Sequence, residues 1–245
     1  MSTIQVRDDN GVRIITFNRP DKRNAINLQM YTQLTEYLIQ GESDNEIRAF
    51  MFRGQADCFT SGNDVADFLQ NSGLGADHPA FRFLFCLLDL QKPVIAAVTG
   101  AAVGIGTTML LHCDLVYADN SAKFQLPFVQ LALVPEAGAS LLLPLAIGQA
   151  KASELLMLGE SFNADDAFTY GLINKVVSSD SIFDYALKRA HQLASQPPIS
   201  LQSTKKLIRY NKEDVRKQME RELKEFEQRL ASDEAKARFA AFLKR

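Results

Sequence analysis

Short runs of β-branched and apolar residues, each closed by a turn and followed by a helical pattern, recur along this chain of 245 residues. The run Val12–Phe17 ends at Asn-Arg-Pro, and the amphipathic stretch that follows has a suitable N-cap in Asn27. The same order returns at Val94–Val98, where a glycine-rich turn leads to an expected helix through residues 109–111 and a strand over residues 115–118. This repetition predicts an α/β fold with largely buried strands.

The later part of the chain continues the alternation of helix and strand. Helices are expected over residues 152–158 and 165–170, because each of these amphipathic stretches is followed directly by a glycine. Asn163 is a suitable N-cap for the second of these helices. A strand is expected over residues 172–177.

After two consecutive prolines the composition becomes helical and charged. Apolar residues at three- and four-residue spacing predict a buried stripe, made of Val215, Met219, Leu223, Phe226 and Leu230. A last helix is expected to carry Phe239, Phe242 and Leu243. We therefore expect a core over residues 1–196 and a C-terminal helical region over residues 197–245 that packs on the core and on a neighbouring subunit.

Composition and charge exclude several classes of protein. The formal net charge is −2 and the basic residues are scattered, which argues against a nucleic-acid partner. Three cysteines without a CxxC pair fit a reducing compartment, and the N-terminus shows no secretory signal, so a cytoplasmic location is expected. Residues 93–113 and 124–150 are nearly free of charge, but glycines, prolines and polar residues interrupt them, which favours buried core over a membrane span.

Glu136 is the only acidic or basic residue between Lys123 and Lys151. Burial in such apolar surroundings would disfavour the carboxylate and raise its pKa, which suits a group that takes and returns a proton near neutral pH. An exposed loop glutamate that favours the start of the next helix through the helix dipole is the alternative.

Two turns rich in small residues each follow an apolar strand. The first runs from Phe59 to Asp64, and the second from Gly100 to Gly106. Backbone N–H groups at such strand-to-helix turns can hold an anion or an oxyanion, although tight packing or a plain turn would explain the same residues. A dinucleotide-binding fingerprint is a weak match, because Met109 stands where its third glycine should be.

Other chemistries find little support in the sequence. Ser61 does not lie in a GxSxG motif, and His112 does not form a triad merely by adjacency to Cys113 and Asp114. The three histidines lack metal-ligand spacing, so no metal site is expected.

Several segments together resemble the crotonase, or enoyl-CoA hydratase/isomerase, superfamily. In chain order they read NRPDKRNAIN, FTSGNDVADF, KPVIAAVTGAAVGIG, CDLVYADNSAKF and GLINKVV. The resemblance implies a spiral of ββα units with a C-terminal helical region, assembled as a homotrimer or a dimer of trimers. It also implies an acyl-CoA thioester substrate and an enolate intermediate, with no cofactor beyond the CoA of the substrate.

The resemblance further implies roles for individual residues. The backbone N–H groups of Asn63 and Ile105 would form the oxyanion hole, and Glu136 would be the catalytic acid and base. Further contacts with the substrate or its CoA moiety are implied for Lys22, Arg23, Ala25, Ser61, Gly62, Asn63, Asp64, Val65, Gly104 and Phe128.

The hydratase branch of this superfamily uses two glutamates, and their positions read Thr108 and Phe128 here. The sequence instead resembles the peroxisomal-type 3-enoyl-CoA to 2-enoyl-CoA isomerases and related bacterial ring isomerases, whose single acid stands where Glu136 stands. A double-bond isomerase is therefore expected. The alternatives are a hydratase or ring isomerase of the same fold, or a non-catalytic acyl-CoA-binding module. Asp64 is the next candidate for the base.

Overall fold

The computed structural model of the protein describes residues 2–55, 57–70, 75 and 77–242. Two sheets form its framework. The larger sheet has the strand order β1 (Ile4–Asp9), β2 (Val12–Phe17), β3 (Ala49–Gly54), β5 (Val94–Val98), β7 (Leu115–Asp119) and β10 (Lys175–Val177). The smaller sheet has the order β4 (Cys58–Thr60), β6 (Ala101–Val103), β8 (Lys123–Gln125) and β9 (Phe162–Asn163).

The chain winds as a spiral in which each turn adds one strand to each sheet. Thus β3, β5 and β7 pair in parallel in the larger sheet, while β4, β6 and β8 pair in parallel in the smaller one. Every residue of β2 and β5 is buried, as expected for strands covered on both faces. This is the α/β fold that the sequence pattern predicts, with the ββα spiral that the family resemblance implies.

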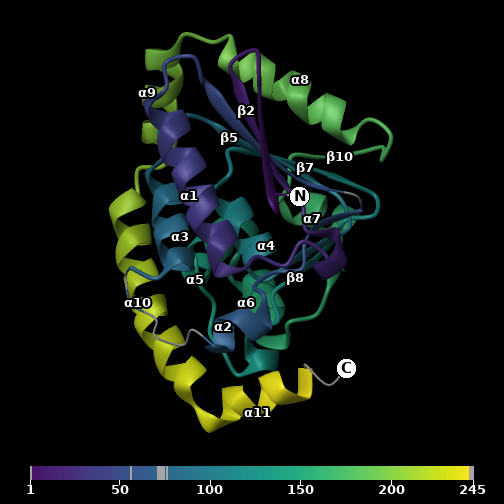
Figure 1. Ribbon diagram of the computed structural model, residues 1–245, viewed down its shortest axis with the longest axis vertical. Helices are drawn as coiled ribbons and strands as arrows, with labels where there is room; N and C mark the ends of the chain where they lie inside the picture. Colours follow the sequence, from purple (N-terminus) through teal and green to yellow (C-terminus); the bar gives the residue numbers. More distant parts are fainter. Residues whose placement is uncertain (1, 56, 71–74, 76, 243–245) are drawn as a thin grey trace.

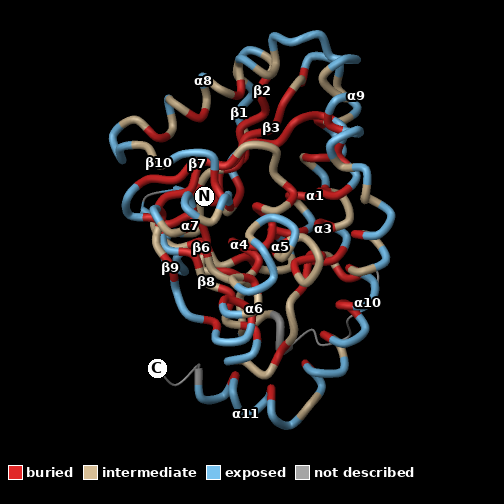
Figure 2. Tube along the Cα trace, turned by 180° about the vertical axis from the view of Figure 1, so that it is seen from behind, coloured by how far each residue is buried: buried red, intermediate tan, exposed pale blue. Residues whose placement is uncertain are grey.

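Helices cover both faces of the larger sheet (Figure 1). On one face α8 (Ile182–Ala194) packs its buried residues against side chains of β2, β3 and β5. The other face carries the main apolar core, which includes α1 (Leu28–Ser43) and α3 (Pro79–Asp89), and Figure 2 shows its buried segments in red. The remaining helices before the C-terminal region are α2 (Val65–Gln70), α4 (Ile105–Thr108), α5 (Ala139–Ile147), α6 (Gln149–Leu158) and α7 (Ala164–Tyr170), with short 3₁₀ turns η1 (Pro20–Lys22), η2 (Met109–His112) and η3 (Val129–Leu131).

The C-terminal helices are α9 (Pro198–Ile208), α10 (Lys212–Ala231) and α11 (Asp233–Phe242). In Figure 1, α9 and α10 run along one side of the core, and α11 crosses its lower end. The expected apolar stripe of α10 is buried throughout, and α10 contacts α3 and α5. Ion pairs add to this packing. Lys205 and Arg209 bind the two carboxylate oxygens of Asp114 at 2.8 and 3.0 Å. Lys212 and Arg216 bind Asp89 at 2.8 and 2.6 Å.

Most of the elements predicted from the sequence are confirmed. Asn27 caps α1 by accepting from the Met30 N–H at 2.9 Å, and Asn163 forms a capping box at α7. Two predictions were wrong in part. Residues 109–111 belong to a 3₁₀ turn after the short α4, and the strand expected over residues 172–177 is confined to β10. Phe239 is buried in α11 as expected, whereas Leu243 lies outside the described residues.

The two nearly uncharged stretches are both part of the globular core. They contribute β5, β6, α4 and α5, together with the turns between these elements. Within the described part of the chain, no helix combines the length and the apolar character needed to cross a membrane.

The ion pairs at Asp114 and Asp89 allow a matched test of how the C-terminal helices are held. Asp114→Asn leaves Lys205, whose side chain is 9% exposed, without its counter-charge, so the free energy of unfolding should fall by about 3 kcal/mol. Asp89 is 50% exposed, so Asp89→Asn should cost less than about 1 kcal/mol. Urea unfolding of both variants measures the difference, and equal losses would contradict this view of the C-terminal contacts.

Candidate active site

Glu136 is buried in the turn that precedes α5. Its residue is 5% exposed, so the alternative of a solvated loop glutamate is wrong. The two following residues, Ala137 and Gly138, both have left-handed backbone angles, with φ of 64° and 71°. This conformation is unfavourable for an alanine, so the surrounding contacts must hold it in place.

Thr108, on α4, donates a hydrogen bond from its hydroxyl to the Glu136 carboxylate. Burial raises the pKa of Glu136 to about 8, the Thr108 hydrogen bond acts in the opposite direction, and the nearby Glu222 carboxylate raises it further. Glu136 therefore has the property that the sequence predicts: it can be protonated or ionised near neutral pH.

His112, in η2, contacts the same turn through its Nε2 atom, which lies 2.7 Å from the carbonyl oxygen of Ala137. Burial lowers the pKa of His112 to about 4, against the effect of this hydrogen bond. The ring is therefore neutral near pH 7, and Nε2 must carry the proton in order to donate to the carbonyl. His112 supports the turn and does not form a nucleophilic triad.

The two turns rich in small residues lie side by side because β4 and β6 are parallel neighbours. A side chain at Gly62 would meet the Val103 carbonyl oxygen at 2.7 Å, which shows how closely the turns approach. Among the described residues, no protein acceptor takes the N–H of Asn63 or of Ile105. Gly104 has open space within 4 Å of where its Cβ would lie, so a ligand can approach the backbone there.

Tyr31 binds the side chain of Asn63 and lies near Glu136. Its buried hydroxyl donates to the side-chain oxygen of Asn63. Burial and the nearby Glu136 carboxylate both raise the pKa of Tyr31 well above its ordinary value. Because α4 also carries Ile105 at its start and Thr108 at its end, Asn63, Ile105 and Glu136 belong to one connected site.

The turn with Lys22 and Arg23 packs against the first of these small-residue turns. The Arg23 carbonyl accepts from the Ser61 N–H at 3.0 Å, and the Ile26 N–H donates to the Gly62 carbonyl at 2.8 Å. The side chains of Lys22 and Arg23 are exposed, and Ala25 is half-buried. The structure thus brings the predicted CoA-contacting residues together with the backbone of residues 61–64.

Asn24 holds this junction together, although its sequence context gave no role for it. Its side-chain nitrogen donates to the Cys58 carbonyl at 2.6 Å, and its side-chain oxygen accepts from the Arg19 N–H at 2.8 Å. Thr60 donates to the Asn24 carbonyl at 2.7 Å. The left-handed φ of 56° at Asn24 is one that asparagine tolerates better than most residues.

Asp64 is a poor alternative to Glu136 as the base. Arg19 binds its carboxylate at 2.6 Å. Partial burial would raise the pKa of Asp64, but the hydrogen bond from Arg19, together with other donors and the Arg19 charge, lowers it below its ordinary value. Asp64 is therefore a fixed anion near neutral pH and lacks the raised pKa of Glu136.

Phe128 and Val65 were also predicted to contact the substrate. Phe128 is 5% exposed and belongs to the main apolar core, just before η3. Val65 is half-buried at the start of α2 and packs against the same core. Val65 directly follows Asp64 in the chain segment that carries Asn63, and the expected substrate contact of Phe128 stays a prediction.

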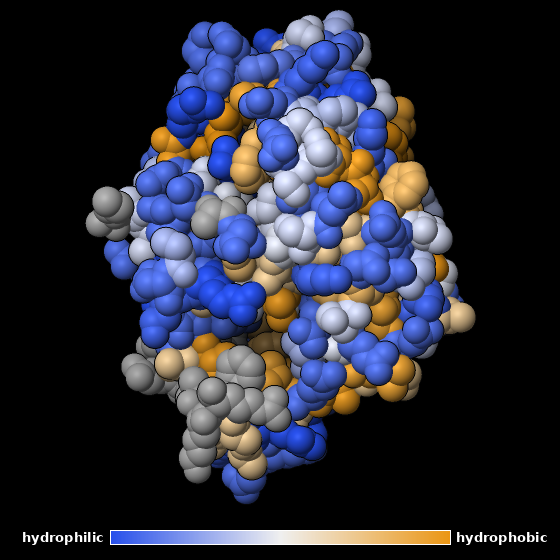
Figure 3. Space-filling model, turned by 90° about the vertical axis from the view of Figure 1, so that its right-hand side faces the viewer, coloured by the Kyte–Doolittle hydropathy of each residue, from blue (hydrophilic) through white to orange (hydrophobic). Residues whose placement is uncertain are grey.

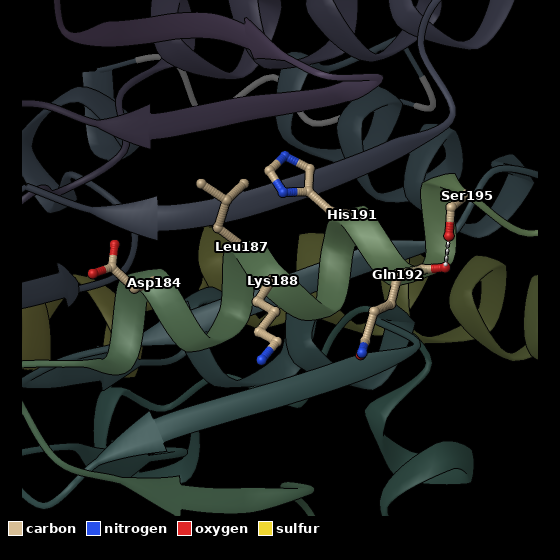
Figure 4. Close-up of a pocket in the computed structure, with 6 residues that line it drawn as sticks. All are labelled: Asp184, Leu187, Lys188, His191, Gln192 and Ser195. Carbon is tan, nitrogen blue, oxygen red and sulfur yellow. Dashed lines mark hydrogen bonds between the residues drawn. The ribbon is translucent and has the colours of Figure 1, made fainter.

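A surface hollow of about 430 Å³ lies elsewhere, and neither Glu136 nor the two turns rich in small residues line it (Figure 4). The helix α8 and its C-cap Ser195 provide the lining side chains, and those on α8 are Asp184, Leu187, Lys188, His191 and Gln192. In the described ranges, no three His, Cys, Asp or Glu side chains are grouped to hold a metal ion.

Comparisons with known proteins identify the family of the chain. Residues 7–245 match the model of the enoyl-CoA hydratase/isomerase family. Rat enoyl-CoA delta isomerase 2 is 36% identical over 86% of the chain, which spans only 55% of that protein. From Escherichia coli K12, 1,2-epoxyphenylacetyl-CoA isomerase is 36% identical over 82% of the chain and 79% of its own length. From the same strain, 2,3-dehydroadipyl-CoA hydratase is 34% identical over 87% of the chain and 84% of its length.

A solved structure has the same fold over almost the whole chain. The crystal structure of an enoyl-CoA hydratase/isomerase from Pseudoalteromonas atlantica T6c superposes with a TM-score of 0.96 at 42% identity. The match covers 99% of this chain and 97% of the other. The chain has the crotonase fold and belongs to the enoyl-CoA hydratase/isomerase family.

Proposed function

We propose that the protein is an enoyl-CoA isomerase that moves a double bond from the 3-position to the 2-position of an acyl-CoA thioester. The observation that carries this proposal is the buried Glu136 carboxyl group, which has a pKa raised to about 8 and is linked through α4 and Tyr31 to two free backbone donors. One carboxylate suffices for this reaction, because the same proton can leave one carbon and return to another. The isomerase names of the rat and E. coli relatives support the assignment.

The proposed reaction begins with the thioester oxygen held by the N–H groups of Asn63 and Ile105. The Glu136 carboxylate removes a proton from the α carbon, and the electron pair of that C–H bond moves toward the thioester carbonyl to give a dienolate. The two donors stabilise the negative charge that develops on the oxygen, which is the largest contribution in reactions of this kind. Protonated Glu136 then gives the proton to the γ carbon, and the oxyanion returns its electrons to form the 2-enoyl product.

The raised pKa of Glu136 suits both halves of this transfer. A carboxylate with an ordinary pKa is a weak base toward carbon, whereas burial makes this one stronger. At pH 7, one unit below a pKa of about 8, roughly one molecule in ten carries the ionised base. Ionised and protonated Glu136 are then close enough in free energy for the proton to be taken and returned.

Hydration is the second candidate, because one of the E. coli relatives is named a hydratase. Adding water requires a group that activates the water and an acid that protonates the neighbouring carbon. At the hydratase positions, however, this chain has Thr108, whose hydroxyl is bonded to Glu136, and the core residue Phe128. This arrangement favours isomerisation, either of a linear enoyl chain as in fatty acid metabolism or of a ring substrate.

We further propose that Lys22 and Arg23 meet the phosphate groups of CoA, because both are exposed next to the turn at residues 61–64.

Assembly as a homotrimer or a dimer of trimers is also a proposal. Exposed apolar side chains support it, and Figure 3, which views the molecule from the side away from α9, shows further apolar patches between polar ones. On α9 and just after it these side chains are Ile199, Leu207, Ile208 and Tyr210.

Glu136→Gln should lower the turnover of a 3-enoyl-CoA by about a thousandfold, because the amide keeps the size of the side chain but cannot accept the α proton. An ultraviolet assay of 2-enoyl-CoA formation measures the rate. Acyl-CoA binding and the unfolding transition should persist. Glu154→Gln on α6, an exposed control of the same chemistry, should behave as wild type. If Glu136→Gln retains more than about a tenth of the turnover, its activation free energy has risen by less than roughly 1.4 kcal/mol, and Glu136 is not the base.

The pH dependence of kcat/KM should show an acid limb with an apparent pKa near 8. Activity requires the ionised carboxylate, so the rate should rise with pH through this value and level off above it. Initial rates from pH 5 to pH 9.5 locate the limb. A rate that is already level at about pH 6, as the ordinary glutamate pKa of 4.5 would give, would mean that Glu136 is solvated in the working enzyme.

Hydration of crotonyl-CoA should be at least about a hundredfold slower than isomerisation of a 3-enoyl-CoA, because no second carboxylate stands at the hydratase positions. Loss of the 2-enoyl absorbance with crotonyl-CoA, compared with its gain with cis- and trans-3-enoyl-CoA, measures both reactions on one enzyme preparation. Comparable rates would favour the hydratase assignment.

A further inference from the structure

We propose that Glu222, on the C-terminal helix α10, is a positioning residue that holds the turn of Glu136 in its working conformation. This proposal rests on the proposed proton transfer by Glu136. It assigns part of the site to the C-terminal helical region, which the sequence predicts only to pack on the core and on a neighbouring subunit.

The Glu222 carboxylate is 6% exposed and is fully engaged with the start of α5. Its Oε2 atom accepts from the Gly138 N–H at 2.6 Å, and its Oε1 atom accepts from the Ser140 N–H at 2.9 Å and from the Ser140 hydroxyl. Gln218, one helical turn earlier on α10, donates to the same hydroxyl at 2.8 Å. The side chains of α10 thus reach the two residues that flank the first position of α5.

These bonds replace a cap that α5 lacks. Gly138 occupies the N-cap position and has no side chain with which to satisfy the first N–H groups of the helix. A carboxylate is also favoured there by the helix dipole. Glu222 provides both functions from 84 residues further along the chain. Its loss would therefore leave buried N–H groups of α5 without an acceptor.

The bonded N–H groups lie two and four residues after Glu136, so their positions determine where its carboxyl group points. The left-handed residues Ala137 and Gly138 separate Glu136 from α5, and a change at either would swing its side chain. Packing supports the same geometry, because a Cβ atom at Gly138 would lie only 3.0 Å from Val215 and 3.3 Å from Met219 of α10. Displacement of a reacting group by about 1 Å can lower a rate by about a hundredfold.

Glu222 also acts on Glu136 through its charge. The groups around Glu136 come from several elements: Thr108 on α4 donates to it, Tyr31 on α1 is uncharged near neutral pH, and neutral His112 on η2 contacts the adjacent carbonyl. Glu222 on α10 is the carboxylate that raises the pKa of Glu136 beyond the effect of burial. Removing its charge should make Glu136 easier to ionise.

The test replaces Glu222 with glutamine, which keeps the size of the side chain but loses the charge and one acceptor. We expect kcat for 3-enoyl-CoA isomerisation to fall about tenfold, with KM within about twofold of wild type. The acid limb of the pH–rate profile should move to lower pH. Glu220→Gln, an exposed substitution on the same helix, should leave kcat, KM and the limb unchanged.

A wild-type kcat in Glu222→Gln would overturn the proposal, and so would a lowered kcat with an unmoved acid limb, because general destabilisation does not change the ionisation of Glu136. If Glu222→Gln does not fold, Glu222→Asp is the test variant. It keeps the charge but is shorter, so a kcat lowered severalfold at unchanged KM supports the proposal and a wild-type kcat overturns it.

Glu136→Gln, measured alongside, distinguishes a failure of the proposed function from a failure of the positioning role of Glu222. If it is active, the proposed function fails whatever Glu222 does. If it is inactive while Glu222→Gln matches wild type, only the positioning role fails.

Discussion

The burial of one carboxyl group without a cation beside it is the constraint on which the site depends. An ionised Glu136 is unfavourable in this apolar environment, and no protein side chain neutralises it in the described part of the chain. The structure compensates through hydrogen bonding and geometry: Thr108 donates to the carboxylate, and His112 and Glu222 bind the C=O and the N–H of the peptide bond between Ala137 and Gly138. The carboxyl group of Glu136 is thereby held in place while its ionised form stays unfavourable. This makes Glu136 a stronger base than an ordinary carboxylate.

The spiral supplies the rest of the site through strand pairing. Because β4 and β6 are parallel neighbours, the turns at their carboxyl ends must meet, and each has one N–H group that finds no acceptor among the residues that the structure describes. These donors belong to main chain, so the identities of Asn63 and Ile105 matter less than the conformation of the turns. Two helices also contact these turns: Tyr31 on α1 donates to the side chain of Asn63, and Glu222 on α10 accepts from the Gly138 N–H.

The sequence revealed those parts of the site that depend on local pattern. Glu136 stood out because it interrupts an uncharged stretch, and the two turns stood out because small residues follow apolar strands. Long-range partners were not visible in this way. The role of Asn24 depends on a carbonyl 34 residues away, and Arg19 neutralises Asp64 across 45 residues. Glu222 was visible in the sequence pattern, because it lies between Met219 and Phe226 on the buried face of α10. A charged residue on such a face requires a partner.

The central claim is that one buried carboxyl group carries the same proton from the α to the γ carbon. A 3-enoyl-CoA deuterated at the α carbon tests it most directly, with mass spectrometry and NMR of the 2-enoyl product at low conversion in ordinary water. The account predicts deuterium at the γ carbon, because Glu136 is only 5% exposed and exchanges its proton slowly with solvent during turnover. A γ carbon that carries hydrogen from solvent alone, at every stage of the reaction, would contradict it.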